Sequence, residues 1–139
     1  MPLLNDQDMT AKEFISKQPL ERQGLLTGIH ESIVESDKTV KVIVEPMMGK
    51  EMIVYKAPGI FKYGLSSVKN YMSLHVMPIY GSPALHSKYK ELLPAASFQK
   101  GCINFKNEKE MPLEIVKQLI EDCSKIDLLK IREEYMSRR

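Results

Sequence analysis

The chain has 139 residues, of which 43% are hydrophobic and 27% charged, a composition typical of a folded globular domain rather than a disordered one. Its net charge of +2 is too small for long-range attraction to nucleic acid or a membrane surface, and it lacks the long apolar run of a transmembrane helix. Two cysteines make no disulfide framework, and the first residues carry acids instead of an apolar leader, so we expect a reduced, cytoplasmic protein.

The first predicted elements are two helices. Thr10 and Glu13 have the spacing of a capping box, which predicts a short helix over residues 10–17. Pro19 suits the first position of a second helix, where its missing N–H leaves no hydrogen bond unmade. The apolar side chains of that second helix recur at helical spacing and form a stripe of Leu26, Ile29 and Ile33.

The middle of the chain has the patterns of strands. Residues 39–44 are rich in β-branched side chains and fit either a strand or the frayed end of the preceding helix. Two apolar runs, 51–56 and 60–65, flank a turn at Ala57-Pro58-Gly59 and predict a hairpin. A further strand is predicted over residues 70–80.

The last third of the chain alternates helices with one predicted strand. Ser82 followed by Pro83 predicts a helix start, because serine caps the helix and proline suits its first position. Residues 97–105 predict a strand, and Pro112 opens another apolar helix. The tail is expected to form an amphipathic helix that packs on the domain or on a second copy, because three of its apolar residues have helical spacing: Leu128, Ile131 and Tyr135.

This order of elements predicts an α+β domain. Strands joined by short turns pair antiparallel, so we expect a single antiparallel sheet with helices packed on one face. The chain then divides into an N-terminal extension with a short helix (1–17), the α+β domain itself (18–125) and a C-terminal amphipathic tail (126–139).

Several features of this pattern recur in a known family. They are a helix with Pro19 and Arg22, a hairpin followed by a strand after Lys69, and then Lys100-Gly101, a short charged turn and Pro112-Leu113 before an apolar helix. Over about residues 18–125 the chain resembles the YdhG-like family of small bacterial domains. The resemblance implies an α+β fold and, for one branch of the family, a role as an intracellular iron chaperone like frataxin.

The strand around Cys102 has two different faces. Ile103 and Phe105 point one way and belong to the core, so Cys102 is expected on the opposite, outer face of the sheet. The side chains that alternation places beside it are Phe98, Lys100, Asn104 and Lys106. Nearby lysines would favour a thiolate, but a small residue that merely fits a strand explains Cys102 equally simply.

The strand around His75 contributes to the same predicted site. Tyr71, Ser73 and His75 share one face of that strand, while its apolar residues face the core. If the strands are neighbours, Lys62 joins them on the outer face. A half-exposed strand histidine with an ordinary hydrogen-bond partner is the simpler interpretation of His75. The candidate ligand-binding residues are therefore Lys62, Tyr71, Ser73, His75, Lys100, Cys102 and Asn104.

Metal-binding patterns are sparse. The chain has neither a His-Glu-x-x-His pattern nor a Cys-x-x-Cys pattern, which argues against a zinc site. Glu31 and Glu35, one helical turn apart, are the candidate iron ligands, although a solvated helix face explains them better. Iron as a cofactor or cargo is thus implied by the resemblance alone.

Three functions follow from these observations. The first is a non-enzymatic binding protein that handles iron or another small ligand. The alternative is a domain that binds a small anionic ligand on the outer sheet face, and the third is an enzyme that uses Cys102 or His75. Nucleic acid and membranes are not expected partners, whereas a homo-oligomer is compatible with the sequence.

Overall fold

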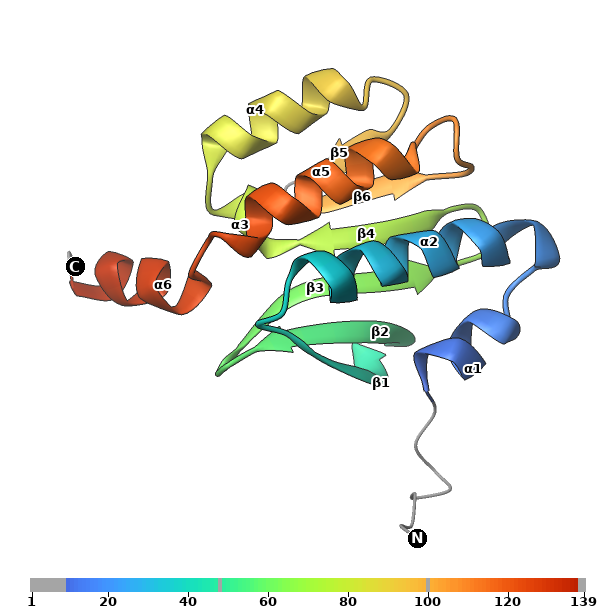
Figure 1. The fold of residues 1–139 in the computed structure, drawn as a ribbon, viewed down its shortest axis with the longest axis horizontal. Coiled ribbons are helices and arrows are strands. Elements are labelled where there is room, and N and C mark those ends of the chain that lie inside the picture. The colour runs from blue at the N-terminus through green and yellow to red at the C-terminus, as the bar shows by residue number, and fades with distance from the viewer. Residues whose placement is uncertain (1–9, 48, 100, 138–139) are drawn as a thin grey trace, which may run out of the picture.

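One antiparallel sheet organises the chain, with strand order β1-β2-β3-β4-β6-β5 (Figure 1). The structure is a computed structural model that describes residues 10–47, 49–99 and 101–137. Its strands are β1 (Lys41–Met47), β2 (Lys50–Ala57), β3 (Ile60–Ser67), β4 (Met72–Val76), β5 (Ser97–Gln99) and β6 (Cys102–Phe105). Its helices are α1 (Ala11–Ser16), α2 (Leu20–Ser36), α3 (Met77–Tyr80), α4 (Pro83–Leu92), α5 (Leu113–Ser124) and α6 (Leu128–Ser137).

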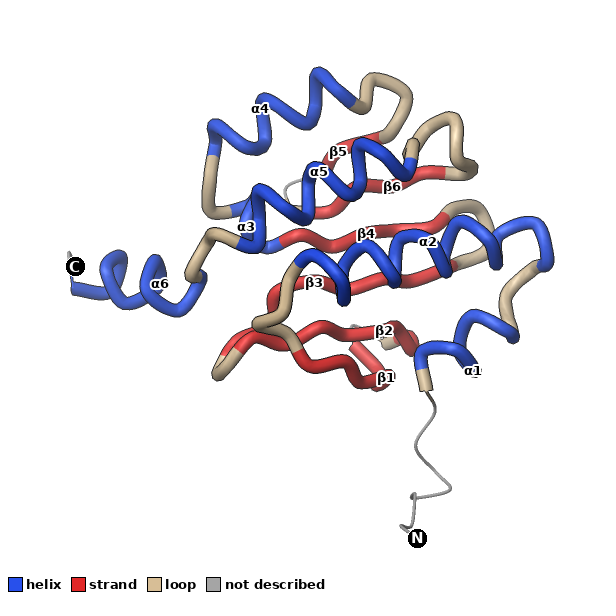
Figure 2. The backbone as a smooth tube through the Cα atoms, viewed as in Figure 1, coloured by secondary structure: helices blue, strands red, loops and turns tan. Residues whose placement is uncertain are grey.

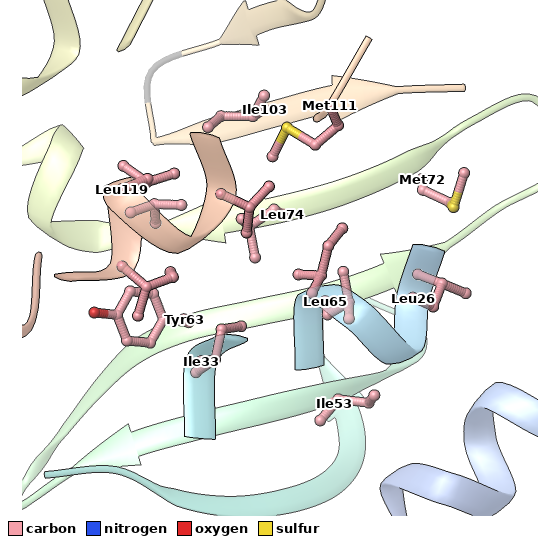
Figure 3. Close-up of a cluster of buried hydrophobic side chains, with 14 of the residues drawn as sticks. Leu26, Ile33, Ile53, Tyr63, Leu65, Met72, Leu74, Ile103, Met111 and Leu119 are labelled. Atoms are coloured by element: carbon pink, nitrogen blue, oxygen red, sulfur yellow. The ribbon is translucent and has the colours of Figure 1, made fainter. Parts of the chain in front are cut away.

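Helices α2 and α5 lie side by side over one face of the sheet (Figures 1 and 2). Figure 3 shows the core between these layers, where Leu26 of α2 and Leu119 of α5 lie over Leu65 and Leu74 of the sheet. All four side chains are fully buried. The predicted α+β architecture with a single antiparallel sheet is therefore confirmed.

The helix starts follow the sequence signals closely. Glu13 N–H donates to Thr10 Oγ1 over 3.1 Å, and Thr10 N–H donates to Glu13 Oε1 over 2.9 Å, so the predicted capping box is present. Ser82 caps α4, with Pro83 at the first helical position. Pro19 is the residue just before α2, which is one position earlier than predicted.

Residues 41–47 resolve the ambiguity between strand and helix end. They form β1, which pairs antiparallel with β2 at one edge of the sheet. Their β-branched side chains favour a pleated surface over a helix, because branching at Cβ restricts χ1 against the preceding helical turn. Val42 and Ile43 are exposed at this edge.

Two predicted strands are shorter than expected. The strand predicted over 70–80 ends at Val76, and α3 follows at once. Pro78 explains the change, because a proline offers no N–H to a neighbouring strand. The strand predicted over 97–105 is instead a hairpin of β5 and β6. Phe98 pairs with Ile103 there, so Phe98 lies on the helix side of the sheet and not beside Cys102.

The turn between β3 and β4 is fastened to helix α2. The Arg22 guanidinium donates to Ser67 Oγ (2.7 Å) and to the carbonyl oxygens of Val68 (2.6 Å) and Lys69 (3.1 Å). Carbonyl groups in such a turn have no strand partner, and the five donors of arginine can satisfy several of them together. This contact holds the end of β3 and the start of β4 in place beside the outer-face residues described below.

The predicted tail helix is present as α6. Its first residue, Leu128, is buried, and Lys130 N–H donates to Asp127 Oδ1 over 3.0 Å at the helix start. The rest of α6 extends away from the sheet (Figure 1). The side chain of Tyr135, which belonged to the predicted stripe, is outside the described residues. Among the residues that the structure describes, no helix is both long and apolar enough to cross a membrane.

Candidate functional site

Two cross-strand rows form the outer face, opposite α2 and α5. In the first row, Ser66 of β3 pairs with Ser73 of β4, which pairs with Asn104 of β6. In the second row, Gly64 pairs with His75, which pairs with Cys102. Paired residues project from the same face of a sheet, so polar side chains from three strands meet there. Four of the predicted residues are brought together in this way: Ser73, His75, Cys102 and Asn104.

Cys102 and His75 are in direct contact. The thiol Sγ lies 2.9 Å from the imidazole Nδ1, so the two side chains share a hydrogen bond whose donor depends on the imidazole tautomer. His75 is only 5% exposed, while Cys102 is half-buried. The sequence placed both residues on this face, but the pairing itself needed the β4–β6 register.

Burial favours the neutral form of both members of this pair. It lowers the pKa of His75, and the nearby Lys50 ammonium lowers it further. Burial also raises the pKa of the Cys102 thiol, and Lys50 offsets this only in part. Both directions favour a thiol beside a neutral imidazole over a thiolate beside an imidazolium, and so disfavour an activated nucleophile.

Two buried polar atoms on this face have no hydrogen-bond partner among the described residues. They are His75 Nε2 and Ser66 Oγ, and Ser66 is 1% exposed. Gly64, which pairs with His75, carries no side chain, and Met52 and Phe61 pack over it: a Cβ there would lie 2.9 Å from Met52 Sδ. These apolar side chains offer no hydrogen bond to His75 Nε2 or Ser66 Oγ. A buried polar group that lacks its hydrogen bond destabilises the fold, so leaving these two atoms unpaired is unfavourable.

The first row leads into a pocket at the end of the sheet. Ser73 Oγ donates to Asn104 Oδ1, and Asn104 also lines a pocket of about 350 Å³. Tyr71 and Ser97 line the same pocket, together with Lys106 and Glu110 at its charged side. Tyr71 is thus close to Asn104, as predicted, although it precedes β4 and does not lie within it.

Lys62 is not on the outer face, so this part of the predicted site is wrong. Tyr55 pairs with Tyr63 but the next residue, Lys56, pairs with Phe61, which leaves Lys62 as an extra residue in β3. Such a β-bulge breaks the alternation of side chains. Lys62 Nζ lies 2.8 Å from Asp37 Oδ2, just beyond the end of α2, and is 2% exposed.

Lys50 is the cation that the sequence did not point to. It follows Gly49, which has a positive φ of 83° in the turn between β1 and β2. The signal for this turn was the Met-Gly-Lys stretch before the strand, but nothing local indicated that Lys50 would act on residues of β4 and β6. The predicted neighbour Lys100 is outside the described residues, and Lys106 is exposed just after β6.

The candidate iron ligands do not join this site. Glu31 and Glu35 are exposed on α2, on the other side of the sheet. Within 10–47, 49–99 and 101–137, no three His, Cys, Asp or Glu side chains are grouped so that they could hold a metal ion. Cys102 and Cys123 are both free, as their different positions predicted, and Cys123 is fully buried on the core-facing side of α5.

Comparison of the chain with protein-family models, with curated proteins and with solved structures finds no match.

Proposed function

We propose that this protein is a non-enzymatic binding protein and that a small polar ligand binds on the outer face of the sheet. The observation that carries the proposal is the pair of buried, unpartnered atoms, His75 Nε2 and Ser66 Oγ. Buried polar atoms usually have a hydrogen-bond partner, so two exceptions on one face favour a ligand that supplies it. Convergent polar groups beside apolar side chains are also the usual content of a ligand site.

The chemistry of the site defines the class of ligand. The Ser66 hydroxyl both donates and accepts, and the imidazole Nε2 donates or accepts according to its tautomer. A compact molecule with both kinds of group suits this pair. The pocket of about 350 Å³ is lined by Asn104, at the other end of the Ser66–Ser73–Asn104 row, and not by Ser66 or His75. A single ordered water is the competing occupant, since a buried water commonly bridges polar groups of this kind.

An enzyme that uses Cys102 and His75 is less well supported. The 2.9 Å contact is the geometry of a thiol and its base, but burial raises the pKa of Cys102 and lowers that of His75. Both directions favour the unreactive neutral pair. The free thiols, one of them beside an imidazole, agree with a reducing compartment, so the cytoplasm is our proposed location.

Iron handling within the YdhG-like family is the rival proposal. It depends on the resemblance, and its ligands would be Glu31 and Glu35 on the surface of α2. The two proposals place the ligand on opposite sides of the sheet, so one experiment can separate them.

The experiment is an amide NMR titration of the isotopically labelled chain with formamide, acetate, inorganic phosphate and Fe²⁺. Outer-face binding is expected to shift the amides of Ser66, Ser73 and His75 with at least one of the first three probes. Paramagnetic broadening by Fe²⁺ confined to Glu31, Glu35 and their neighbours would favour the iron proposal and reject the outer-face site. An absence of any outer-face shift with all three small molecules would leave water as the occupant and reject it as well.

Matched variants make the test specific. Ser66→Ala and His75→Phe each remove one unpartnered atom and should abolish the outer-face shifts. Gln99→Ala is the control, because Gln99 pairs with Cys102 at the same row but is exposed at the far strand. Shifts that survive both substitutions, or that disappear in the Gln99 variant alone, contradict the assignment.

A further inference from the structure

A second pocket lies on the helix side of the sheet, away from the outer face. It has a volume of about 540 Å³ and is formed where the end of α2, the β2–β3 turn, the end of α5 and the start of α6 meet. Its apolar lining includes Ile60, Leu128 and Leu129, and its cationic lining is Lys38, Lys62 and Lys125. This volume is within the usual range for small-molecule sites, and apolar walls with a few charged groups are typical of them.

Lys62 is the buried member of this lysine set. Both oxygens of the Asp37 carboxylate that pairs with Lys62 already accept two hydrogen bonds each. Its Oδ1 accepts hydrogen bonds from Thr39 N–H (3.0 Å) and from Thr39 Oγ1 (2.5 Å), and its Oδ2 accepts one from Tyr63 O–H (2.7 Å) as well as the Lys62 ammonium (2.8 Å). Burial raises the pKa of Asp37, but the hydrogen bonds from Lys62, Thr39 and Tyr63 outweigh this effect and hold the pKa below its usual value, which favours the carboxylate.

The Lys62 ammonium, in contrast, is only partly satisfied. An ammonium group has three N–H donors, and Asp37 Oδ2 is its one hydrogen-bonding partner among the described residues. The side chain is 2% exposed, and besides Asp37 its ammonium faces the Tyr63 ring, whose centroid lies 5.7 Å from Nζ. Because Lys62 lines the pocket, an acidic oxygen of a bound molecule can accept one of these free N–H groups in a charge-assisted hydrogen bond.

The surrounding charges favour a single negative charge on the ligand. Lys38 and Lys125 are exposed at the rim, while the opposing carboxylates are Asp37 and Asp127. Asp127 Oδ1 already accepts the Lys130 N–H at the start of α6. The ends of α2 and α5 also turn carbonyl oxygens toward this region, and these weaken a purely electrostatic attraction for anions. Apolar contact must therefore supply much of the affinity, which argues against inorganic anions.

We propose that this pocket binds a small organic monocarboxylate, with the carboxylate on Lys62 Nζ and the apolar body against Ile60, Leu128 and Leu129. The sequence suggested an anion-binding site on the outer sheet face that included Lys62. Because Lys62 lies on the helix side of the sheet, the anion site proposed here is on that side. The site is independent of the outer-face ligand proposed above, because the sheet separates the two.

The test compares hexanoate with hexanamide, which has the same apolar chain and no charge. Amide NMR titrations of the full chain should give shifts at Thr39, Ile60 and Leu128 for both probes, with hexanoate binding about tenfold more tightly, as expected for one charge-assisted hydrogen bond of roughly 1.5 kcal/mol. Equal affinities, or shifts that fall outside the pocket, would overturn the proposal.

Substitutions then assign the difference to Lys62. Lys62→Met should remove most of the preference for hexanoate over hexanamide, and its amide spectrum reports whether the fold is kept. The double variant Lys38→Gln/Lys125→Gln changes only exposed groups and provides an independent test that does not disturb the core: hexanoate binding should weaken while hexanamide binding stays the same. Lys90→Gln, an exposed lysine on α4, is the charge-matched control and should change neither. An unaffected preference for hexanoate in a folded Lys62→Met variant refutes the assignment. If that variant does not fold, an undiminished preference in the double variant refutes it.

Discussion

Burial decides the chemistry of the residues that looked most reactive. Cys102 and His75 are in contact, yet the low exposure of His75 and the apolar cover around Gly64 favour neutral forms of both groups. The Lys50 charge lowers the pKa of both groups. It therefore opposes the effect of burial on the pKa of Cys102 and adds to the effect of burial on the pKa of His75. The same two residues on a wetter face would be a plausible nucleophile and base, so their surroundings and not their identities set their role.

The pH dependence of Cys102 alkylation tests this conclusion. Because burial raises the pKa of the thiol, the rate with iodoacetamide should reach half its maximum at a higher pH than in the unfolded chain, whose thiol has a pKa of about 8.5. Peptide mapping by mass spectrometry follows Cys102 separately from Cys123. Lys50→Gln should move the midpoint further upward, since Lys50 lowers this pKa. A folded-state midpoint below that of the unfolded chain would restore the thiolate and the enzymatic interpretation.

Two histidines, the half-buried His30 and the buried His75, should make the fold sensitive to mild acid. Burial lowers the pKa of His30, whose Nδ1 lies 2.7 Å from the Tyr55 hydroxyl, and also that of His75. The unfolded chain therefore takes up protons first as the pH falls below about 6.5, and the folded state is destabilised relative to it. The free energy of unfolding, measured with urea, should decrease from about pH 6.5 downward. It should also decrease above about pH 8.5, because the thiol pKa values are raised in the folded state.

His75→Phe is the matched variant for that measurement. It removes one of the two groups and should make the decrease shallower, whatever its effect at neutral pH. A slope identical to that of the unchanged chain would show that His75 takes up its proton equally in the folded and unfolded states.

At the scale of elements, two local irregularities move side chains between faces. The β-bulge at Lys62 turns its side chain toward Asp37, and the β5–β6 hairpin turns Phe98 toward the core, where its ring meets His86 edge-on at 5.6 Å. A change of one residue in strand register exchanges the two faces of a sheet. Each irregularity therefore transferred one predicted outer-face residue to the helix side.

The packing of α2 on α5 gives a prediction at the same scale. Gly24 and Gly28 lie one turn apart in α2, and a Cβ at Gly24 would meet nothing within 4 Å. Gly24→Ala should therefore stabilise the fold by roughly 0.5–1 kcal/mol, because alanine loses less backbone entropy in a helix. A Cβ at Gly28 would lie 2.7 Å from Leu113 Cδ1, so Gly28→Ala must displace Leu113 of α5 and should gain less or destabilise.

Urea denaturation of the two variants measures this difference, with the unchanged chain as reference. Equal stabilisation by both substitutions would mean that Leu113 moves aside freely and that α2 and α5 are not in the close contact described. Destabilisation by Gly24→Ala would instead contradict its open surroundings.

For the whole molecule, the sheet separates two candidate sites and the tail completes one of them. Leu128 is buried and Leu129 lines the pocket beside Lys62, whereas the remainder of α6 extends outward. Deleting residues 127–139 should thus lower stability by about 1.5–3 kcal/mol, the usual contribution of one buried leucine. Thermal unfolding measures the loss, and sedimentation reports whether the tail also joins two copies.

A shorter deletion separates these roles. Removing residues 132–139 keeps Leu128 and Leu129 in place and should leave the melting temperature close to that of the full chain. If the longer truncation matches the full chain in both melting temperature and sedimentation, α6 packs neither on the domain nor on a second copy.

Local patterns were sufficient to predict the fold class and most of the elements, although not α3 or the β5–β6 hairpin. Capping residues, prolines and apolar periodicity depend on neighbours within a few positions, and they correctly predicted α1, the start of α4 and the α+β sheet. Alternation also placed Ser73, His75, Cys102 and Asn104 on one face, because side-chain direction in a regular strand depends only on parity.

The tertiary structure decided which of these residues meet and in what surroundings. The β4–β6 register set the contact of Cys102 with His75, the bulge in β3 assigned Lys62 to Asp37, and the turn before β2 brought the charge of Lys50 to bear on His75 and Cys102. Each depends on pairing between segments far apart in the chain, which no local pattern encodes. Burial is likewise a property of the assembled layers, and since it shifts the pKa of the site residues, the chemistry of the site could be assigned only from the folded chain.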